Sequence, residues 1–433
     1  MERTGLQAAV NREMAISRRR HTVAKLRGLA FLFATSALFV LFQGGKLSAA
    51  VFLMVSVLCA YVLSGRWSGI ERVEGSRVLA PAARTPPAKG GDRPFSGSLE
   101  AGSSLAVRIR VRIPGVWPVP YVIVRDRLIR RGGFEMPFET SLVPDWRRQG
   151  EATYETPPLR RGFYRFGRTE CWTEDVFGLF EHRGWLDLSQ SFAVLPKTAE
   201  IRQWRLLYRW MRGSHVHTAV VWSQRETTQI NGVREYIYGD RVSRIHWNAT
   251  AKTGTWKSKE FEREALPRSW IVLDRRGSVY RSEEEFELAV SVVASLLSYL
   301  ARRDLAVGLL SVGRKTTVFE PARRAASRKE VWEHLIEAEA DGSGDWTDAV
   351  REATGRWPSG SFAAVVTPVG ESPAAVADLF RKRGVNACFI GLAAGRSPEE
   401  ADRWRRLLAA SGTPGYRVES LEQLPAVLEE RVR

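Results

Sequence analysis

The carboxy-terminal part of the chain alternates between compact apolar runs and amphipathic stretches, and this alternation constrains the fold more than any other feature. Ser269–Leu273 predicts a buried strand, and Ser282–Glu285 predicts a capping box that opens a long amphipathic helix. Amphipathic stretches separate further predicted strands at 305–312, 362–367, 385–390 and 416–418. Strand–helix alternation at this spacing is typical of a mostly parallel, doubly wound α/β sheet, which we expect over residues 268–433.

The middle of the chain has a different pattern. From residue 105 to residue 113, apolar residues alternate with arginines at every second position, which predicts a half-buried strand. Short β-rich runs follow at 119–124, 163–166 and 192–195. We therefore expect a small antiparallel β-sandwich or barrel over 99–200. The Pro-, Gly- and Arg-rich residues 65–98 before it are typical of a linker or an extended edge segment.

Two apolar segments near the amino terminus, Gly28–Phe42 and Leu47–Leu63, are separated by a short polar turn. Each is shorter than the ~20 residues of a comfortable membrane span, but about 17 suffice when basic side chains extend the ends. A transmembrane helical hairpin is therefore expected at 28–64, after a basic tail at 1–27. The alternative is a buried helical hairpin in a soluble domain.

The distribution of basic residues predicts the orientation and the compartment. Lysines and arginines crowd both outer ends of the hairpin, whereas the turn holds only Lys46. By the positive-inside rule, both termini and the soluble domains are expected on the cytoplasmic side of the cell membrane. The three cysteines lie far apart in sequence, which disfavours a disulfide framework or a cysteine zinc site.

The net charge restricts the partners. A formal charge of +17 favours an anionic neighbour, either nucleic acid or a negatively charged membrane surface. Arginines on solvated faces near anionic lipid explain this charge, so we expect membrane association and no nucleic-acid binding. A basic nucleic-acid-binding membrane protein, with tryptophans as stacking platforms, is the alternative.

Residues 234–254 combine charges, aromatics and turn residues more densely than an ordinary core strand or amphipathic helix. They lie in a connector, residues 201–267, between the β-rich and α/β regions. The acidic side chains are expected to neutralise the arginines and fix their geometry. Two roles remain open, partner binding and bracing between domains, and the candidate residues for both are Arg234, Glu235, Tyr236, Asp240, Arg244 and Trp247.

This segment resembles the signature of the bacterial family catalogued as domain of unknown function 58. The similar pattern is Arg-Glu-Tyr, two residues, Gly-Asp, then Arg-Ile, one residue, Trp, and Ala-Lys-Thr-Gly, with looser similarity in Arg161–Tyr164 and Asp175–Leu179. The resemblance implies a membrane-anchored protein with a von Willebrand factor A-like domain, commonly encoded beside MoxR-type AAA ATPases. We expect a cytoplasm-facing scaffold or adaptor that binds such an ATPase in the assembly or maturation of other proteins.

Asp274 follows the first α/β strand, and ligands bind at the carboxyl ends of such strands. Compared with the Asp-x-Ser-x-Ser metal motif of von Willebrand factor A-like domains, Asp274 and Ser278 match, Arg276 replaces the middle serine, and Thr347 stands for the later loop threonine. An aspartate expected near residue 367 is missing. Because Mg²⁺ needs several oxygen ligands, we expect no metal and a docking surface in which Arg276 pairs with Asp274.

Other interpretations of this position remain open. A working metal site would make the chain a metal-dependent adhesion module, and Asp274 could also do no more than cap its turn. His215 and His217 have a spacing that zinc can use, but no other ligand stands nearby in sequence. His246 could act as an acid or base, although a structural imidazole fits its aromatic surroundings better. The sequence contains no nucleotide-loop or hydrolase motif, so neither an enzyme nor a cofactor is expected.

Overall fold

The structure is a computed structural model, and the chain divides into two compact units, Met1–Leu195 and Pro196–Arg433. The residues that it describes are 27–64, 69–82, 99–116, 119–174, 181–213, 224–238, 242–265, 268–322, 325–344, 346–370 and 373–430. His215, His217 and Asp240 lie outside these residues, so the structure gives no information on their expected roles.

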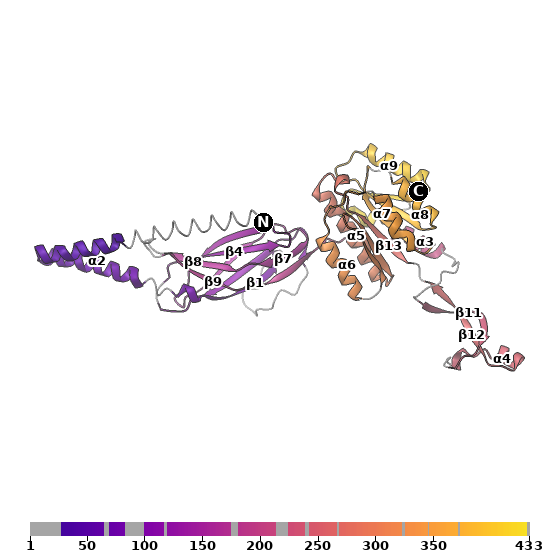
Figure 1. Ribbon diagram of the computed structural model, residues 1–433, viewed down its shortest axis with the longest axis horizontal. Coiled ribbons are helices and arrows are strands. Elements are labelled where there is room, and N and C mark those ends of the chain that lie inside the picture. Colours follow the sequence, from indigo (N-terminus) through magenta and orange to yellow (C-terminus); the bar gives the residue numbers. More distant parts are fainter. Residues whose placement is uncertain are drawn as a thin grey trace. The chain divides into compact units, whose positions relative to one another are not determined.

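Two apolar helices begin the described chain, Arg27–Gln43 and α2, Lys46–Ser64 (Figure 1). Gly44 and Gly45 make the turn between them with φ angles of 60° and 94°, a conformation that glycine adopts without strain. The rings of Phe33 and Phe52 lie 5.4 Å apart, so the two helices contact each other. Within the described chain, α2 is the one helix long and apolar enough to cross a membrane.

The rest of the first unit consists of two stacked β-sheets. Strands β1 (Glu74–Pro81), β3 (Leu105–Arg112) and β6 (Gln149–Glu155) form an antiparallel sheet with β3 in the centre. The larger sheet has the order β2-β10-β7-β4-β8-β9, with β5 also paired to β4. Apolar residues from both sheets form one buried cluster, as the expected sandwich requires. The strands of the larger sheet are β2 (Leu99–Glu100), β4 (Val122–Arg130), β5 (Glu135–Leu142), β7 (Gly162–Phe166), β8 (Thr169–Glu174), β9 (Glu181–Leu186) and β10 (Ser191–Leu195).

Strand β1 lies within residues 65–98, where a linker or an extended edge segment was expected, and it forms one edge of the three-stranded sheet. It pairs with β3 along its whole length, from Glu74 opposite Arg112 to Pro81 opposite Leu105. Its anchor is polar, because the buried guanidinium of Arg77 donates to Asp126 at 2.7 Å and lies 4.0 Å from the ring centroid of Phe166. A strand held by a buried arginine lacks the apolar alternation by which strands are recognised in a sequence.

The second unit contains the expected mostly parallel sheet. Its order is β15-β14-β13-β16-β17-β18, with only β15 antiparallel to its neighbour. The chain starts in the middle of this sheet and turns back on itself between β13 and β16, which makes their carboxyl ends the topological switch point. The strands are β13 (Ser269–Asp274), β14 (Val307–Val312), β15 (Thr317–Ala322), β16 (Phe362–Pro368), β17 (Asn386–Leu392) and β18 (Gly415–Val418).

Helices cover both faces of this sheet (Figure 1). Alternate residues of β13 point to opposite sides, with Ile271 and Leu273 in one buried cluster and Trp270 and Val272 in the other. The first cluster packs against α3 (Arg205–Gly213), α5 (Glu283–Arg302), α6 (Ala325–Glu337) and α10 (Leu424–Glu429). The second packs against α7 (Trp346–Ala353), α8 (Ala374–Lys382) and α9 (Pro398–Ala410).

The connector expected at 201–267 contains α3 and a long antiparallel hairpin. Its strands are β11 (Gln224–Glu235) and β12 (Lys257–Ala265), which pair with register shifts between Glu226 and Gly232. The 3₁₀ turn η3 (Val242–Arg244) and the short helix α4 (Trp247–Thr253) lie between the two strands. The segment that resembles a family signature therefore forms the tip of this hairpin.

Candidate functional site

Asp274 lies at the end of β13, at the switch point of the α/β sheet, where ligands bind in folds of this kind. Its side chain is fully buried. Thr367, near the end of the neighbouring strand β16, donates its hydroxyl to Oδ2 of Asp274 at 3.0 Å. The two strands that flank the switch point are thus joined by a buried hydrogen bond.

Arg276 supplies the other donors to this carboxylate. Its main-chain N–H and its Nε donate to Oδ1 of Asp274 at 3.0 and 3.1 Å, and its Nη2 donates to Oδ2 at 2.8 Å. The guanidinium carbon lies 5.1 Å from the ring centroid of Trp346, at the start of α7. An ionised carboxylate accepts about four hydrogen bonds, so that Arg276 and Thr367 fill the acceptor positions that a cation would otherwise use.

The other two positions of the degenerate metal motif come from two different segments. Ser278 is exposed in the 3₁₀ turn η4, Gly277–Val279, and Thr347 is half-buried on the first turn of α7. Gly342 brings the two loops together, since it accepts from the amide of Gly277 at 3.0 Å and donates to the carbonyl of Arg275 at 2.9 Å. In the described part of the chain, no three His, Cys, Asp or Glu side chains form a group that could hold a metal ion.

Tyr280 holds the loop that follows Asp274 through a hydrogen bond to the main chain. Its hydroxyl donates to the main-chain oxygen of Asp274. Burial raises the pKa of Tyr280 well above its ordinary value, and the negative charges of Asp274 and Glu285 raise it further. The phenol therefore stays protonated and remains a hydrogen-bond donor at physiological pH.

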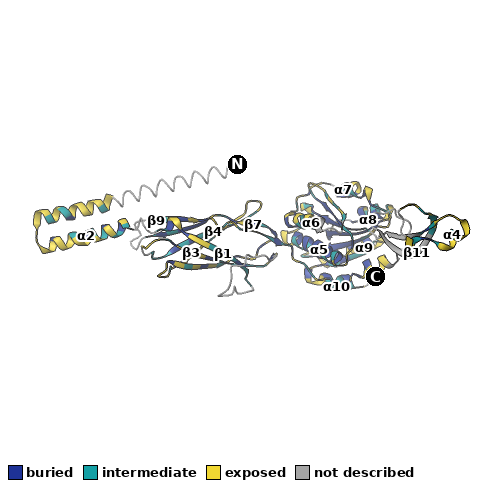
Figure 2. Cartoon of the chain, turned by 90° about the horizontal axis from the view of Figure 1, so that it is seen from below, coloured by how far each residue is buried: buried dark blue, intermediate teal, exposed yellow. Residues whose placement is uncertain are grey.

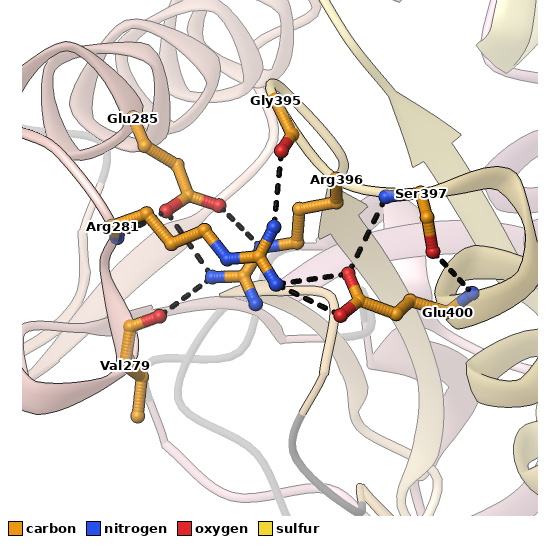
Figure 3. Close-up of polar contacts among 7 residues, drawn as sticks. All are labelled: Val279, Arg281, Glu285, Gly395, Arg396, Ser397 and Glu400. Atoms are coloured by element: carbon orange, nitrogen blue, oxygen red, sulfur yellow. Dashed lines mark hydrogen bonds and ion pairs between the residues drawn. The ribbon is translucent and has the colours of Figure 1, made fainter.

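A second arginine–carboxylate pair joins the start of α5 to the loop before α9 (Figure 3). Glu285 accepts from Arg396 Nε at 2.8 Å and from the amide of Arg281 at 2.7 Å, while Arg396 also donates to the carbonyl of Val279 at 2.6 Å. Both charged side chains are nearly inaccessible to solvent. Ser282 caps α5 as expected, but the carboxylate of Glu285 turns to Arg396 and Arg281 instead of completing the box with Ser282.

A third pair lies on the solvent side of the same network (Figure 3). Arg281 donates to both carboxylate oxygens of Glu400 at 2.8 and 3.1 Å, and to the carbonyl of Gly395 at 3.0 Å. Glu400 also completes a capping box with Ser397 at the start of α9. The loops at the carboxyl edge of the sheet are thus held together by arginine–carboxylate pairs within the chain.

The signature residues gather at the hairpin tip around three aromatic rings. Tyr236 and Trp247 lie on either side of Trp256, with ring centroids 5.8 and 6.2 Å from it. Glu235 pairs with Lys257 across the hairpin at 3.2 Å, and Arg234 donates to the carbonyl of Glu235 at 2.9 Å. Trp256 and Lys257 were not among the predicted site residues, because they lie beyond the segment that carries the family pattern.

The remaining polar residues of the tip shape its backbone. His246 is the N-cap of α4, and its Nδ1 accepts from the amide of Ala249 at 3.1 Å, which makes it the structural imidazole that the sequence favoured. Arg244 ends η3, directly before the buried side chain of Ile245. The amides of Tyr236 and His246 donate to the carbonyls of Trp256 and Lys257, so the tip is a continuation of the hairpin.

Large apolar side chains of the tip remain accessible to solvent. Trp247 is 62% exposed and Trp256 is 58% exposed. Ile237, Tyr238 and Val242 are more exposed still. We call these five residues the aromatic tip. Contiguous exposed apolar surface of this kind marks interaction sites in soluble domains.

Comparison with known proteins finds a family model that matches part of the second unit. Residues 232–362, which include the hairpin tip and the switch point, match the model described as "Protein of unknown function DUF58". This match and one relative support membership of the DUF58 family. It is 26% identical over 268 residues to the "Uncharacterized protein YeaD" of Bacillus subtilis (strain 168). That match covers 60% of this chain and 64% of the relative, so less than two thirds of the relative is spanned.

Solved structures give only distant likenesses. Proximal thread matrix protein 1 from the mussel byssus matches 38% of this chain and 46% of its own, with 15% identity and a TM-score of 0.28. A calcium binding mutant of Bacteroides uniformis beta-glucuronidase 2 matches 79% of this chain and 33% of its own, with 10% identity and a TM-score of 0.18. TM-scores this low define no shared fold.

Proposed function

We propose that this DUF58 protein is a membrane-anchored scaffold or adaptor, not an enzyme, and that it docks a protein partner through the aromatic tip. The observation that carries the proposal is the exposure of Trp247 and Trp256 within the family-matching region. Tryptophan and tyrosine dominate the energetics of protein interfaces because they bury a large area at a small entropic cost. A brace between domains is the competing role, and it requires these side chains to be covered by another part of the same chain.

The switch point is the second part of the proposed docking surface, and it works without a metal ion. We propose that the α/β domain is von Willebrand factor A-like and that the guanidinium of Arg276 stands where such domains hold a cation. Support comes from the four donors that already occupy Asp274. Isothermal titration of the protein with Mg²⁺ and Mn²⁺ should give no micromolar binding. Micromolar binding that Asp274→Ala abolishes would overturn the metal-free site.

The anchor is proposed to be the pair of helices at 27–64, each crossing the membrane. Support comes from α2, whose Leu53, Met54 and Val57 are each more than 60% exposed. Figure 2 shows α2 largely in the colour of exposed residues. A core helix of a soluble domain buries such side chains, whereas lipid covers them at no cost.

The proposed partner is a MoxR-type AAA ATPase, which is what the family resemblance implies. The test is co-purification of the full chain from solubilised membranes, with and without ATP, followed by identification of the bound proteins. Trp247→Ala with Trp256→Ala should lose the partner. The matched control is Trp185→Ala, because Trp185 is 54% exposed on β9 of the other unit. Retention of the same partner by the tip variant would contradict docking through the tip.

A further inference from the structure

The sheet of the second unit has an open edge at β18. This strand pairs only with β17 among the described strands, so its outer side faces a groove of about 910 Å³. The groove is lined by β18 and the turn before it, and by side chains of α3, α9 and α10. An open edge beside a groove is the geometry in which an extended peptide adds to a sheet.

The main chain of β18 has hydrogen-bonding groups on the groove side. The carbonyls of Pro414 and Val418 accept from the amides of Phe389 in β17 and of Ala393 directly after it, at 2.9 and 2.8 Å. Because main-chain groups alternate along a strand, the amide and carbonyl of Arg417 point away from β17. These groups are available to pair with a further strand.

The two walls of the groove differ in chemistry. On the α9 side stand Arg405 and Arg406, and Arg417 points to the same side of the sheet. The direction follows from the neighbouring Gly415, whose absent Cβ would lie 2.7 Å from Leu408 of α9. On the opposite side, α3 and α10 contribute the apolar side chains of Leu206 and Val427 to the lining, and α3 also contributes Arg209.

The charge of the groove is strongly positive. Its lining includes the four arginines 209, 405, 406 and 417 against one carboxylate, Glu430. Two of these arginines already have acidic neighbours, since Arg405 lies 3.7 Å from Asp402 and Arg417 pairs with Glu419. Such solvent-exposed pairs contribute little to stability, so a ligand carboxylate can replace them at small cost.

We infer that this groove binds an extended acidic segment of a protein partner as a seventh strand beside β18. Side chains of an added strand alternate between the two faces of the sheet. Those on the face of Arg405, Arg406 and Arg417 would be acidic, and those on the face of Leu206 and Val427 would be apolar. The recognised sequence therefore alternates acidic and apolar residues. This inference rests on the proposed docking function and adds a second contact to it.

A small phosphate compound is the competing ligand for four arginines. Such a compound would leave the apolar wall and the outward amide of Arg417 without partners. A peptide would contact both of them as well as the arginines, so we favour the peptide as the ligand. The two ligands differ in a measurable way. A peptide site distinguishes an alternating sequence from the same residues in two blocks, whereas a simple anion site responds to total charge.

The experiment measures fluorescence anisotropy of a labelled ten-residue peptide that alternates Glu and Val, with the full chain in detergent. We expect binding that is at least about tenfold tighter than that of the block peptide of equal composition, and of a peptide alternating Lys and Val. Equal binding of the alternating and block peptides, or displacement of the peptide by millimolar pyrophosphate, would overturn the inference.

Variants test the two recognition elements separately. Arg406→Gln should weaken the peptide about tenfold, whereas Arg403→Gln, on α9 outside the groove, should leave the affinity unchanged. Arg417→Gln and Arg417→Pro both remove the charge, but only proline also removes the outward amide, so Arg417→Pro should bind more weakly still. Equal affinities of these two variants, with equal melting temperatures, would contradict strand addition.

The aromatic tip separates this inference from the proposed function. Trp247→Ala should bind the peptide with unchanged affinity, because the tip does not line the groove. If the peptide fails to bind while partner capture still requires the tip, the groove proposal is wrong and the docking function stands. If the peptide binds while partner capture does not require the tip, the proposal of peptide binding in the groove is supported and the proposal of docking through the tip is wrong.

Discussion

At the scale of single residues, the arrangement around Asp274 depends on one arginine. Replacing Arg276 by methionine keeps much of the side-chain volume but leaves a buried carboxylate with only Thr367 and one amide as donors. Breaking a buried pair from one side costs about 3 kcal/mol, because the remaining charge is uncompensated. We expect a loss of that size for Arg276→Met in urea unfolding of the second unit.

The control for this prediction is the double variant Asp274→Asn with Arg276→Met. The double variant no longer buries an unpaired Asp274 carboxylate, so most of the stability that is lost in Arg276→Met should return. The coupling between the two substitutions is then large and opposite in sign to the single losses. Additive losses in the double variant would show that the pair does not hold the switch point together.

At the scale of elements, two glutamates at the same helical position allow a matched comparison. Glu285 and Glu400 each stand three residues after a serine N-cap, and each pairs with an arginine from another loop. The pair of Glu285 with Arg396 is buried, whereas the side chains of Glu400 and Arg281 are 40% and 51% exposed. The two glutamate–arginine pairs therefore differ in how far they are buried, and not in their position relative to the helix N-cap.

We predict that Glu285→Gln destabilises the second unit by about 3 kcal/mol, since it leaves the guanidinium of Arg396 buried without its counter-charge. Glu400→Gln should cost less than about 1 kcal/mol, because water screens that pair and glutamine preserves the capping box. Both values come from denaturant unfolding followed by tryptophan fluorescence. Similar losses of stability in the two variants would mean that the exposed pair stabilises the second unit as much as the buried pair does.

Elements with a regular apolar pattern were predictable, and elements with other anchors were not. Strand β13 is visible in the sequence as a short apolar run, whose residues Ile271 and Leu273 point to one face and Trp270 and Val272 to the other. The N-cap of α5 is visible as Ser282 before a run of glutamates. Strand β1 was not separated from a linker because its anchor is the buried Arg77, and β15 was missed because it is an edge strand. The pairing of Asp274 with Arg276 followed from local chemistry over two residues.

The parts of the site that bring distant residues together could not be read from the sequence. Arg396 reaches Glu285 over a separation of 111 residues, and nothing in the local pattern of either residue indicates the other. The groove beside β18 likewise depends on α3, which precedes the sheet in sequence, and on α10, which follows it. Such contacts are set by the strand order, which the alternation of strands and helices restricts but does not specify.

At the scale of the whole molecule, the proposed orientation of the chain rests on the charges that flank the two apolar helices. Arg18, Arg19 and Arg20 precede the first helix, Arg66 and Arg72 follow α2, and the turn carries only Lys46. Retaining the basic flanks in the cytoplasm places the turn outside and both soluble units inside. This orientation can be measured by labelling two variants, each with one introduced cysteine, on opposite sides of the membrane.

The native cysteines leave a low background for such labelling. Cys59, Cys171 and Cys388 are all buried and free of disulfides. Burial raises the pKa of Cys171 to about 12, and burial also raises the pKa of Cys388. Since the thiolate is the reactive form, neither of these two thiols should react appreciably with a maleimide at neutral pH in the folded protein.

We therefore predict that Lys46→Cys in the turn is labelled by a membrane-impermeant maleimide in intact cells. Val143→Cys in the first unit, where the native side chain is 76% exposed, should be labelled only after the membrane is opened. The physical reason is that in the proposed orientation only the turn lies outside, although both positions are accessible to solvent. Labelling of Val143→Cys in intact cells would place the soluble units outside and exclude a cytoplasmic partner such as an AAA ATPase.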